Sequence, residues 1–188
     1  MVQSRIRTEF VATHKVISRA TIPPALTGND RGWSYSKPSQ SDARDCQTGE
    51  WMMNSFTGRC LCGAVRYEFT GDAVLALNCH CRDCQRASGG ASTPALFVLR
   101  NSLKISGSAK YYDSIGESGK VISRGFCPNC GSALFGQPEL MPDVISIRPG
   151  TLDDPSTFRP AIDIYTASAQ PWDVMDPAIP KFSAAPPR

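Results

Sequence analysis

The sequence contains no long hydrophobic run and no concentrated block of charge. Its 188 residues include no stretch near the roughly 18 consecutive apolar residues that a membrane-spanning helix needs. The formal net charge is only +3, and the Lys and Arg residues are scattered along the chain instead of forming a basic stripe. The sequence therefore favours neither a membrane nor a nucleic acid as a partner.

The N-terminal segment also lacks the apolar core of a secretory signal, so we expect a soluble, cytoplasmic protein. In a reducing compartment, eight cysteines do not form a disulfide framework, and such thiols typically bind a metal or serve in catalysis. Their spacing is therefore informative. Cys46 stands alone, and the other seven form three tight groups: Cys60 with Cys62, then Cys79, Cys81 and Cys84, then Cys127 with Cys130.

Residues 1–51 differ in composition from the rest of the chain. They are polar and show no sustained helical or strand period, so we expect a disordered leader. The folded domain is expected to cover residues 52–188, a length sufficient to bury a core of its own. His14 and Cys46 lie in the expected leader, and we assign no function to either.

Beyond residue 52, short apolar runs alternate with turn residues. Val65, Tyr67 and Phe69 alternate with polar residues, which predicts a strand with one buried face. Further runs bounded by Gly, Pro, Asn and Ser predict strands at residues 73–77, 95–99, 103–105, 120–122, 133–135, 144–147 and 162–165. One short helix is expected at residues 82–87, and the proline-rich tail should be mostly irregular. The predicted fold class is all-β.

Two of the cysteine groups have the form of a zinc-binding turn. In Cys127-Pro128-Asn129-Cys130-Gly131 and in Cys60-Leu61-Cys62-Gly63, the second cysteine precedes a glycine, which can take the positive φ that turns backbone N–H groups toward the sulfurs. Two such turns supply the four thiolates of a tetrahedral zinc site. We therefore predict a structural zinc with four ligands: Cys60, Cys62, Cys127 and Cys130.

The remaining group, Cys79, Cys81 and Cys84, has no fourth cysteine in the expected domain. Three protein ligands and one open position are typical of catalytic zinc, so we predict two zinc ions per chain. Three thiolates leave this site with a net charge of about −1, which suits binding a thiol better than activating water. His80 lies between two of these cysteines, and its side chain should point away from theirs.

Other interpretations of this group stay open. The second zinc could be purely structural, completed by water, by His80 or by a partner. Cys81 and Cys84 have the C-x-x-C spacing of thiol–disulfide exchange, although a βαβ setting is absent. Free cysteines can also be buried simply as small hydrophobic residues.

The three cysteine motifs together resemble the family of glutathione-dependent formaldehyde-activating enzymes and centromere protein V. The similarity is carried by residues 58–65, 79–84 and 126–131, and it extends to residues 150–154 and to Pro171-Trp172. It covers roughly residues 57–182. The resemblance implies tent-like stacked antiparallel sheets around a structural zinc, with the same two sets of cysteine ligands. One departure is Asp163, near whose position relatives often carry a histidine.

The resemblance also implies a carbon–sulfur lyase, whose founding reaction reversibly joins glutathione to formaldehyde to give S-hydroxymethylglutathione. The expected partner is a small-molecule thiol such as glutathione, and the adduct can contain formaldehyde or a related small electrophile. Glutathione carries two carboxylates, so Arg82, Arg86 and Arg124 are candidates to bind it.

Two other function classes remain. A non-catalytic zinc-binding protein-interaction module predicts an exposed apolar patch, whereas an enzyme predicts a concave pocket lined by basic and aromatic groups. A redox sensor predicts thiolates that oxidise and release zinc.

Overall fold

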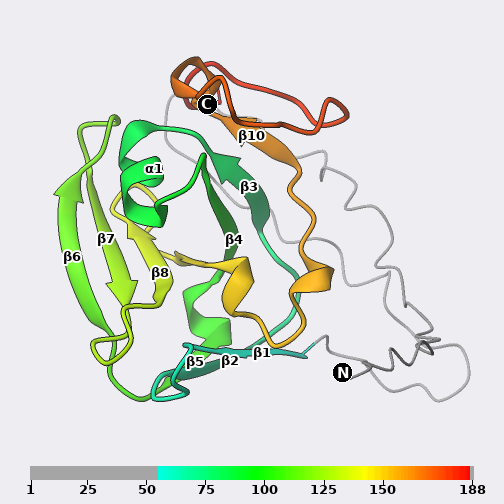
Figure 1. The fold of residues 1–188 in the computed structure, drawn as a ribbon. Coiled ribbons are helices and arrows are strands. Elements are labelled where there is room, and N and C mark those ends of the chain that lie inside the picture. Colours follow the sequence, from blue (N-terminus) through cyan, green and yellow to red (C-terminus); the bar gives the residue numbers. More distant parts are fainter. Residues whose placement is uncertain (1–54, 187–188) are drawn as a thin grey trace, which may run out of the picture.

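The computed structural model describes residues 55–186. The expected leader at residues 1–51, with His14 and Cys46, lies outside the described residues. Figure 1 shows strands around a single α-helix, α1 (Arg82–Ser88), in the described part of the chain. The strands are β1 (Ser55–Arg59), β2 (Arg66–Thr70), β3 (Leu75–Cys79), β4 (Thr93–Leu99), β5 (Leu103–Ser106), β6 (Lys110–Ile115), β7 (Val121–Phe126), β8 (Ala133–Pro138), β9 (Val144–Ile147) and β10 (Ile162–Ile164).

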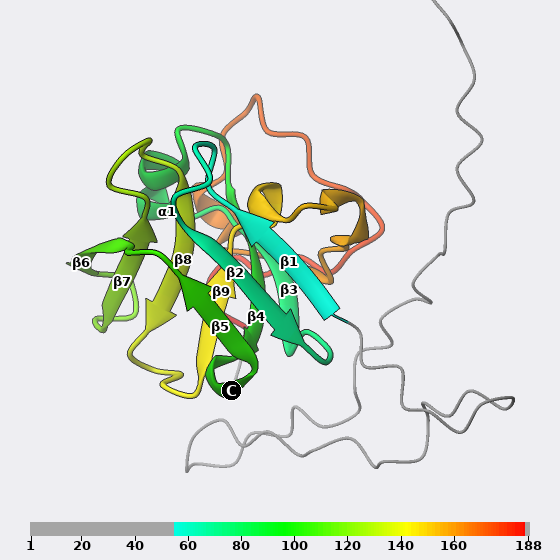
Figure 2. The same cartoon turned by 90° about the horizontal axis from the view of Figure 1, so that it is seen from below.

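The strands form two sheets. The smaller sheet has the order β1-β2-β5, and the larger has the order β10-β3-β4-β9-β8-β7-β6. Viewed from below, the small sheet lies across the large one (Figure 2). All neighbouring strands are antiparallel except β10, which runs parallel to β3. The predicted all-β class with stacked antiparallel sheets is therefore confirmed, with this one parallel pair as an exception.

The main core lies between the two sheets. Tyr67 and Phe69 of β2 are buried, and the outward residues of that strand are exposed, as the alternation in the sequence predicted. The Tyr67 ring meets Phe135 of β8 edge to face, with ring centroids 5.6 Å apart. All four residues of β9 are buried, because this strand lies between β4 and β8 in the interior of the large sheet. Apolar burial of this kind is the dominant favourable contribution to folding.

The predicted helix and the predicted strands agree in position with elements of the structure, which also contains two strands that the sequence did not predict. β6 is an edge strand with mostly exposed side chains, so it lacks the alternation that marks a half-buried strand. β1 has the polar sequence Ser-Phe-Thr-Gly-Arg and buries only Gly58 fully. Short 3-10 turns at Pro149–Thr151, Pro155–Thr157 and Thr166–Ser168 make up much of the irregular tail.

No helix among residues 55–186 is both long enough and apolar enough to cross a membrane.

A substitution in the core tests the arrangement of the sheets. Ile147 of β9 has 0% of its surface exposed, whereas Ile115 at the edge of the large sheet is 72% exposed. We expect Ile147→Ala to lower the free energy of unfolding by about 2–5 kcal/mol, because it removes buried methyl groups and leaves a cavity. The matched change Ile115→Ala should cost less than about 1 kcal/mol. Urea denaturation of the full chain measures both, and equal losses would contradict the assigned core.

Candidate metal centres and the adjoining pocket

The structure brings the first and third cysteine groups together. Cys60 and Cys62 lie in the turn between β1 and β2, and Cys127 and Cys130 lie in the turn between β7 and β8. The four sulfurs all lie within 4.8 Å of one another. This cluster therefore joins a hairpin of the small sheet to a hairpin of the large one.

Local backbone geometry explains why both turns present their sulfurs in the same way. Gly63 and Gly131 adopt positive φ values of 75° and 73°. The Gly63 N–H donates to the Cys60 carbonyl, and the Gly131 N–H donates to the Cys127 carbonyl. The Val65 N–H then donates to the Cys60 sulfur at 3.3 Å. Both glycines thus take the positive φ that the sequence predicted.

The spacing of these sulfurs fits a zinc ion. Four sulfurs at about 2.3 Å from a tetrahedral zinc lie about 3.8 Å from one another. The Cys60 and Cys62 sulfurs are 3.5 Å apart, and those of Cys62 and Cys127 are 3.7 Å apart. A hydrogen bond with the Ser132 hydroxyl lowers the pKa of Cys130 to about 5, which favours the thiolate that binds metal.

The middle group forms a second cluster at the start of α1. Cys79 ends β3, Cys81 is the N-cap of α1, and Cys84 lies in its first turn. The Cys84 N–H donates to the Cys81 sulfur at 3.4 Å, and the three sulfurs lie within 4.8 Å of one another. Within residues 55–186, no His, Asp or Glu joins this triplet at that distance. The arrangement fits three ligands with one open position.

The thiols of the triplet do not ionise alike. Hydrogen bonds from Cys79 and Cys81 lower the pKa of Cys84 to about 3, and the charges of Arg148 and Arg124 act in the same direction. Hydrogen bonds with Cys81 and Cys84 raise the pKa of Cys79. The cluster therefore favours a thiolate at Cys84, the form in which cysteine binds a metal.

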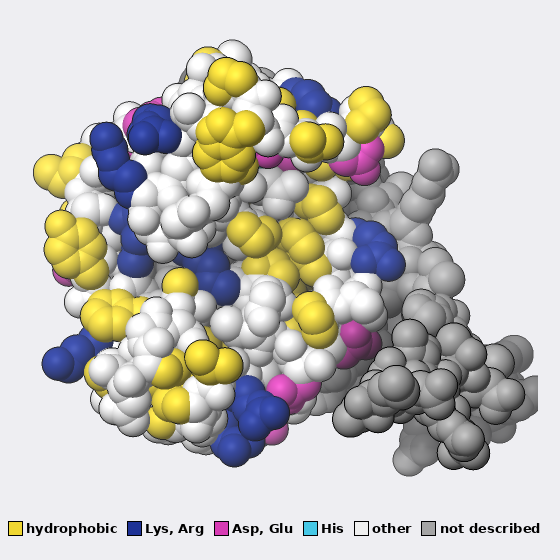
Figure 3. Space-filling view, in the orientation of Figure 1, with side chains coloured by type: hydrophobic (Ala, Val, Ile, Leu, Met, Phe, Trp, Pro, Cys, Tyr) yellow, Lys and Arg dark blue, Asp and Glu magenta, His cyan; other side chains and the backbone are white. Residues whose placement is uncertain are grey.

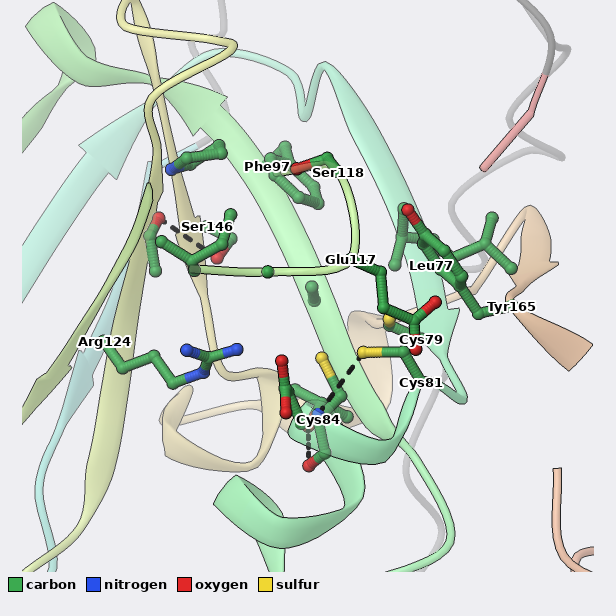
Figure 4. A pocket seen from close by; sticks show the side chains of 18 of the residues that line it. Leu77, Cys79, Cys81, Cys84, Phe97, Glu117, Ser118, Arg124, Ser146 and Tyr165 are labelled. Carbon is green, nitrogen blue, oxygen red and sulfur yellow. Dashed lines mark hydrogen bonds between the residues drawn. The ribbon is translucent and has the colours of Figure 1, made fainter. Parts of the chain in front are cut away.

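The triplet opens onto a cavity of about 170 Å³. Its lining includes six apolar side chains: Leu77, Ala95, Phe97, Ile122, Pro138 and Ile164. Figure 4 shows Arg124 pointing toward the cysteines from β7, with Glu117 and Tyr165 on the other side of them. Tyr165 has a φ of 57°, and it is the one residue other than glycine with positive φ within residues 55–186. Such backbone strain is often found at functional sites.

The structure separates the three candidate arginines. Arg124 lines the cavity, but Arg82 and Arg86 are exposed on α1 and do not. Arg82 donates to Gln85, and Arg86 pairs with Asp83 at 3.7 Å. Although Arg82 and Arg86 are close to the cysteines in sequence, they lie outside the cavity, because a helix directs neighbouring side chains to different sides.

Sequence reasoning missed Arg148, which follows β9 and also lines the cavity. One signal was available in the sequence. Ser146 and Arg148 are the polar residues in a run that is otherwise apolar, and their separation of two places them on one face of the chain. Both contribute to the pocket.

His80 points away from the cysteine triplet. Its Nδ1 lies 2.6 Å from Asp173 Oδ2, and its Nε2 lies 3.4 Å from Asp163 Oδ1. Both His80 and Asp163 are buried, and Asn78 donates to Asp163 Oδ1 at 3.0 Å. Asp163 is therefore not part of the cavity lining.

One family of known proteins matches the part of the chain that forms the site. The model of the family described as glutathione-dependent formaldehyde-activating enzyme matches residues 55–168, which include both cysteine clusters. No curated protein matches the chain at a significant level. The crystal structure of a Rhodobacter sphaeroides protein is similar at 20% sequence identity and a TM-score of 0.41, over 66% of this chain and 98% of that one. Because the family match spans more than half of the sequence, the chain belongs to the family of glutathione-dependent formaldehyde-activating enzymes.

Proposed function

We propose that the protein is a zinc-dependent carbon–sulfur lyase that acts on an adduct of glutathione, or of another thiol, with formaldehyde or a related small electrophile. The observation that carries this proposal is the position of the cysteine triplet in the wall of a cavity that also contains arginine and aromatic side chains. A concave pocket of this composition is what the enzyme interpretation predicts.

The ligands proposed for the structural zinc are Cys60, Cys62, Cys127 and Cys130, and those proposed for the catalytic zinc are Cys79, Cys81 and Cys84. When bound at the triplet, zinc supplies an open position that binds a thiol and lowers its pKa. The apolar side chains around the triplet, including Leu77 and Phe97, exclude water from the reacting sulfur. A protein with these free thiols functions best in a reducing compartment, which supports a cytoplasmic location.

The tail supports a second candidate, a non-catalytic zinc-binding protein-interaction module. Trp172 is 64% exposed and Val174 is 95% exposed, and both lie in the segment that follows β10. They are two side chains on an irregular segment, whereas monomeric proteins that bind partners usually expose a larger contiguous apolar patch. The pocket beside the triplet therefore favours the enzyme.

Zinc stoichiometry tests the two proposed sites. We expect two zinc ions per purified chain, one of which a weak chelator removes, because the triplet has an open position and the four-cysteine site is closed. Calorimetric titration should show glutathione binding before chelation, no binding after it, and recovery when zinc is returned. The reconstituted protein should then form S-hydroxymethylglutathione from glutathione and formaldehyde. A single tightly bound zinc with no thiol binding would favour the interaction module.

Two cysteine substitutions test the separate roles of the two clusters. Cys130→Ser should lose the cooperative unfolding transition and both zinc ions, because a structural zinc contributes directly to folding. Cys81→Ser should keep a native far-UV circular dichroism spectrum and lose one zinc. Thermal unfolding and zinc analysis of the two variants provide the comparison. If both variants unfolded to the same extent, the division into structural and catalytic sites would be wrong.

A further inference from the structure

Two arginines from different strands meet in the cavity beside the cysteine triplet. Arg124 lies on β7 opposite Gly136 of β8, and Gly136 lies opposite Ser146 of β9. Arg148 follows Ser146 by two residues and therefore lies on the same side of the sheet. In Figure 3, basic atoms lie at the centre of this face, beside a group of apolar side chains.

Because Gly136 has no side chain, the Arg148 side chain can occupy the space beside it. A Cβ atom at position 136 would lie 3.3 Å from Arg148 Nη2 and 2.5 Å from Ser146 Oγ. Arg148 therefore extends across β8 at the residue paired with Arg124. The two positive charges are close enough that Arg124 contributes to lowering the pKa of Arg148, although burial has the larger effect.

Neither guanidinium has an acidic partner among residues 55–186. The ion pairs in this part of the chain do not include Arg124 or Arg148. Arg124 donates to the Ser114 hydroxyl, and the Arg148 side chain donates to no other described residue. Of the two carboxylates in the lining, Asp83 pairs with Arg86, and Glu117 is exposed in the turn between β6 and β7. Both arginines are partly buried, and two like charges held close together without an anion repel each other at an energetic cost.

The cysteines compensate for only part of this positive charge. Both arginines line the same cavity as the cysteine triplet, so thiolates there would offset part of their charge. However, three thiolates and one Zn²⁺ carry a net charge of about −1, whereas two guanidiniums carry about +2. The zinc site and the two guanidiniums together therefore carry a charge of about +1, without the carboxylate of the exposed lining residue Glu117, and an anion in the cavity would balance it.

We propose that Arg124 and Arg148 form a carboxylate-binding subsite, and that the substrate is a small adduct that carries a carboxylate next to its carbon–sulfur bond. This inference rests on the lyase function proposed above. Guanidinium groups bind carboxylates through paired, charge-assisted hydrogen bonds. The cavity volume of about 170 Å³ is below the roughly 300–1,000 Å³ of pockets that hold drug-sized ligands. A small acid therefore fits beside the triplet, while the remainder of a peptide such as glutathione would extend outside.

The carboxylate has two possible sources, the thiol or the aldehyde. A 2-oxo acid of the size of glyoxylate provides it on the electrophile, and a thiol such as mercaptoacetate provides it on the nucleophile. In either case the thiol sulfur forms a bond to the aldehyde carbon, and the carbonyl π electrons move to oxygen, which gains the proton lost by the thiol. Nothing is oxidised or reduced, so the step needs no further reactant, and the reverse step breaks the same carbon–sulfur bond.

Calorimetry with the zinc-loaded full chain tests the subsite without an activity assay. Three probes are compared. Mercaptoacetate has both a thiol and a carboxylate, 2-mercaptoethanol has a thiol without a carboxylate, and acetate has a carboxylate without a thiol. We expect mercaptoacetate to bind at least roughly tenfold more tightly than 2-mercaptoethanol, the scale of a charge-assisted hydrogen bond. Arg148→Met should abolish this preference, and Arg148→Lys should retain part of it. Arg159→Met, a change in an exposed arginine bonded to its own loop, should match the unaltered protein.

A second comparison identifies the source of the carboxylate. With glutathione as the common thiol, the rates of adduct formation with glyoxylate and with formaldehyde are measured in the unaltered protein and in Arg148→Met. A preference for glyoxylate that disappears in Arg148→Met assigns the carboxylate to the aldehyde. The carboxylate is assigned to the thiol if Arg148→Met changes the rates with glyoxylate and formaldehyde equally and the unaltered protein binds mercaptoacetate more tightly than 2-mercaptoethanol. Either result supports the subsite.

Three results separate a failure of the carboxylate subsite from a failure of the proposed lyase function. Equal affinity of the unaltered protein for mercaptoacetate and 2-mercaptoethanol overturns the subsite. Loss of zinc from Arg148→Met with the carboxylate preference intact also overturns it, since the arginines would then only balance the thiolate charge. Arg148-dependent binding of acetate without binding of any thiol supports the subsite but contradicts the lyase function. Arg124→Met provides the same readouts if Arg148→Met does not fold.

Discussion

The pairing register of the large sheet determines which side chains meet in the pocket. Arg124 lies opposite Gly136, Gly136 opposite Ser146, and Ser146 opposite Phe97, so one row of residues crosses four strands. Paired residues direct their side chains to the same face, and a slip of one residue would move a strand's contribution to the other face. The backbone hydrogen bonds that stabilise the sheet therefore also position the lining of the cavity, and the small residue at position 136 leaves the central part of this row open.

The cysteines lie where strands end, outside this row. Four of them belong to two turns, and the other three lie between β3 and the first turn of α1. Turn geometry fixes the direction of a sulfur more firmly than the middle of a strand does, because the N–H and carbonyl groups of the turn bond to one another. In the turn at Cys60, the hydrogen bond from Gly63 closes the backbone, and the Val65 N–H points at the sulfur. The large sheet thus provides the pocket, and the turns provide the groups that can hold metal.

Local chemistry explains which parts of this arrangement the sequence could predict. The grouping of Cys60 with Cys127 followed from the glycines after each pair, because a positive φ is a property of the turn itself. Arg148 could not be found in the same way, since its role depends on the pairing of β8 with β9. Arg82, by contrast, is close to the cysteines in sequence but is exposed on α1. The parallel pairing of β10 with β3 was missed for a similar reason, because a three-residue strand carries no signal of its direction.

The tail that follows β10 supports the cysteine triplet through buried polar contacts. His80 lies between Cys79 and Cys81, yet its ring reaches back to Asp163 on β10 and to Asp173 in the tail that follows it. Gln85 strengthens this connection, because its amide donates both to the His80 carbonyl and to the Ser168 carbonyl. Loss of one partner from a buried charged network leaves the others without compensation, so these contacts are sensitive to substitution. A substitution at position 163 would consequently alter how the loop between Cys79 and Cys81 is held, although Asp163 itself does not line the pocket.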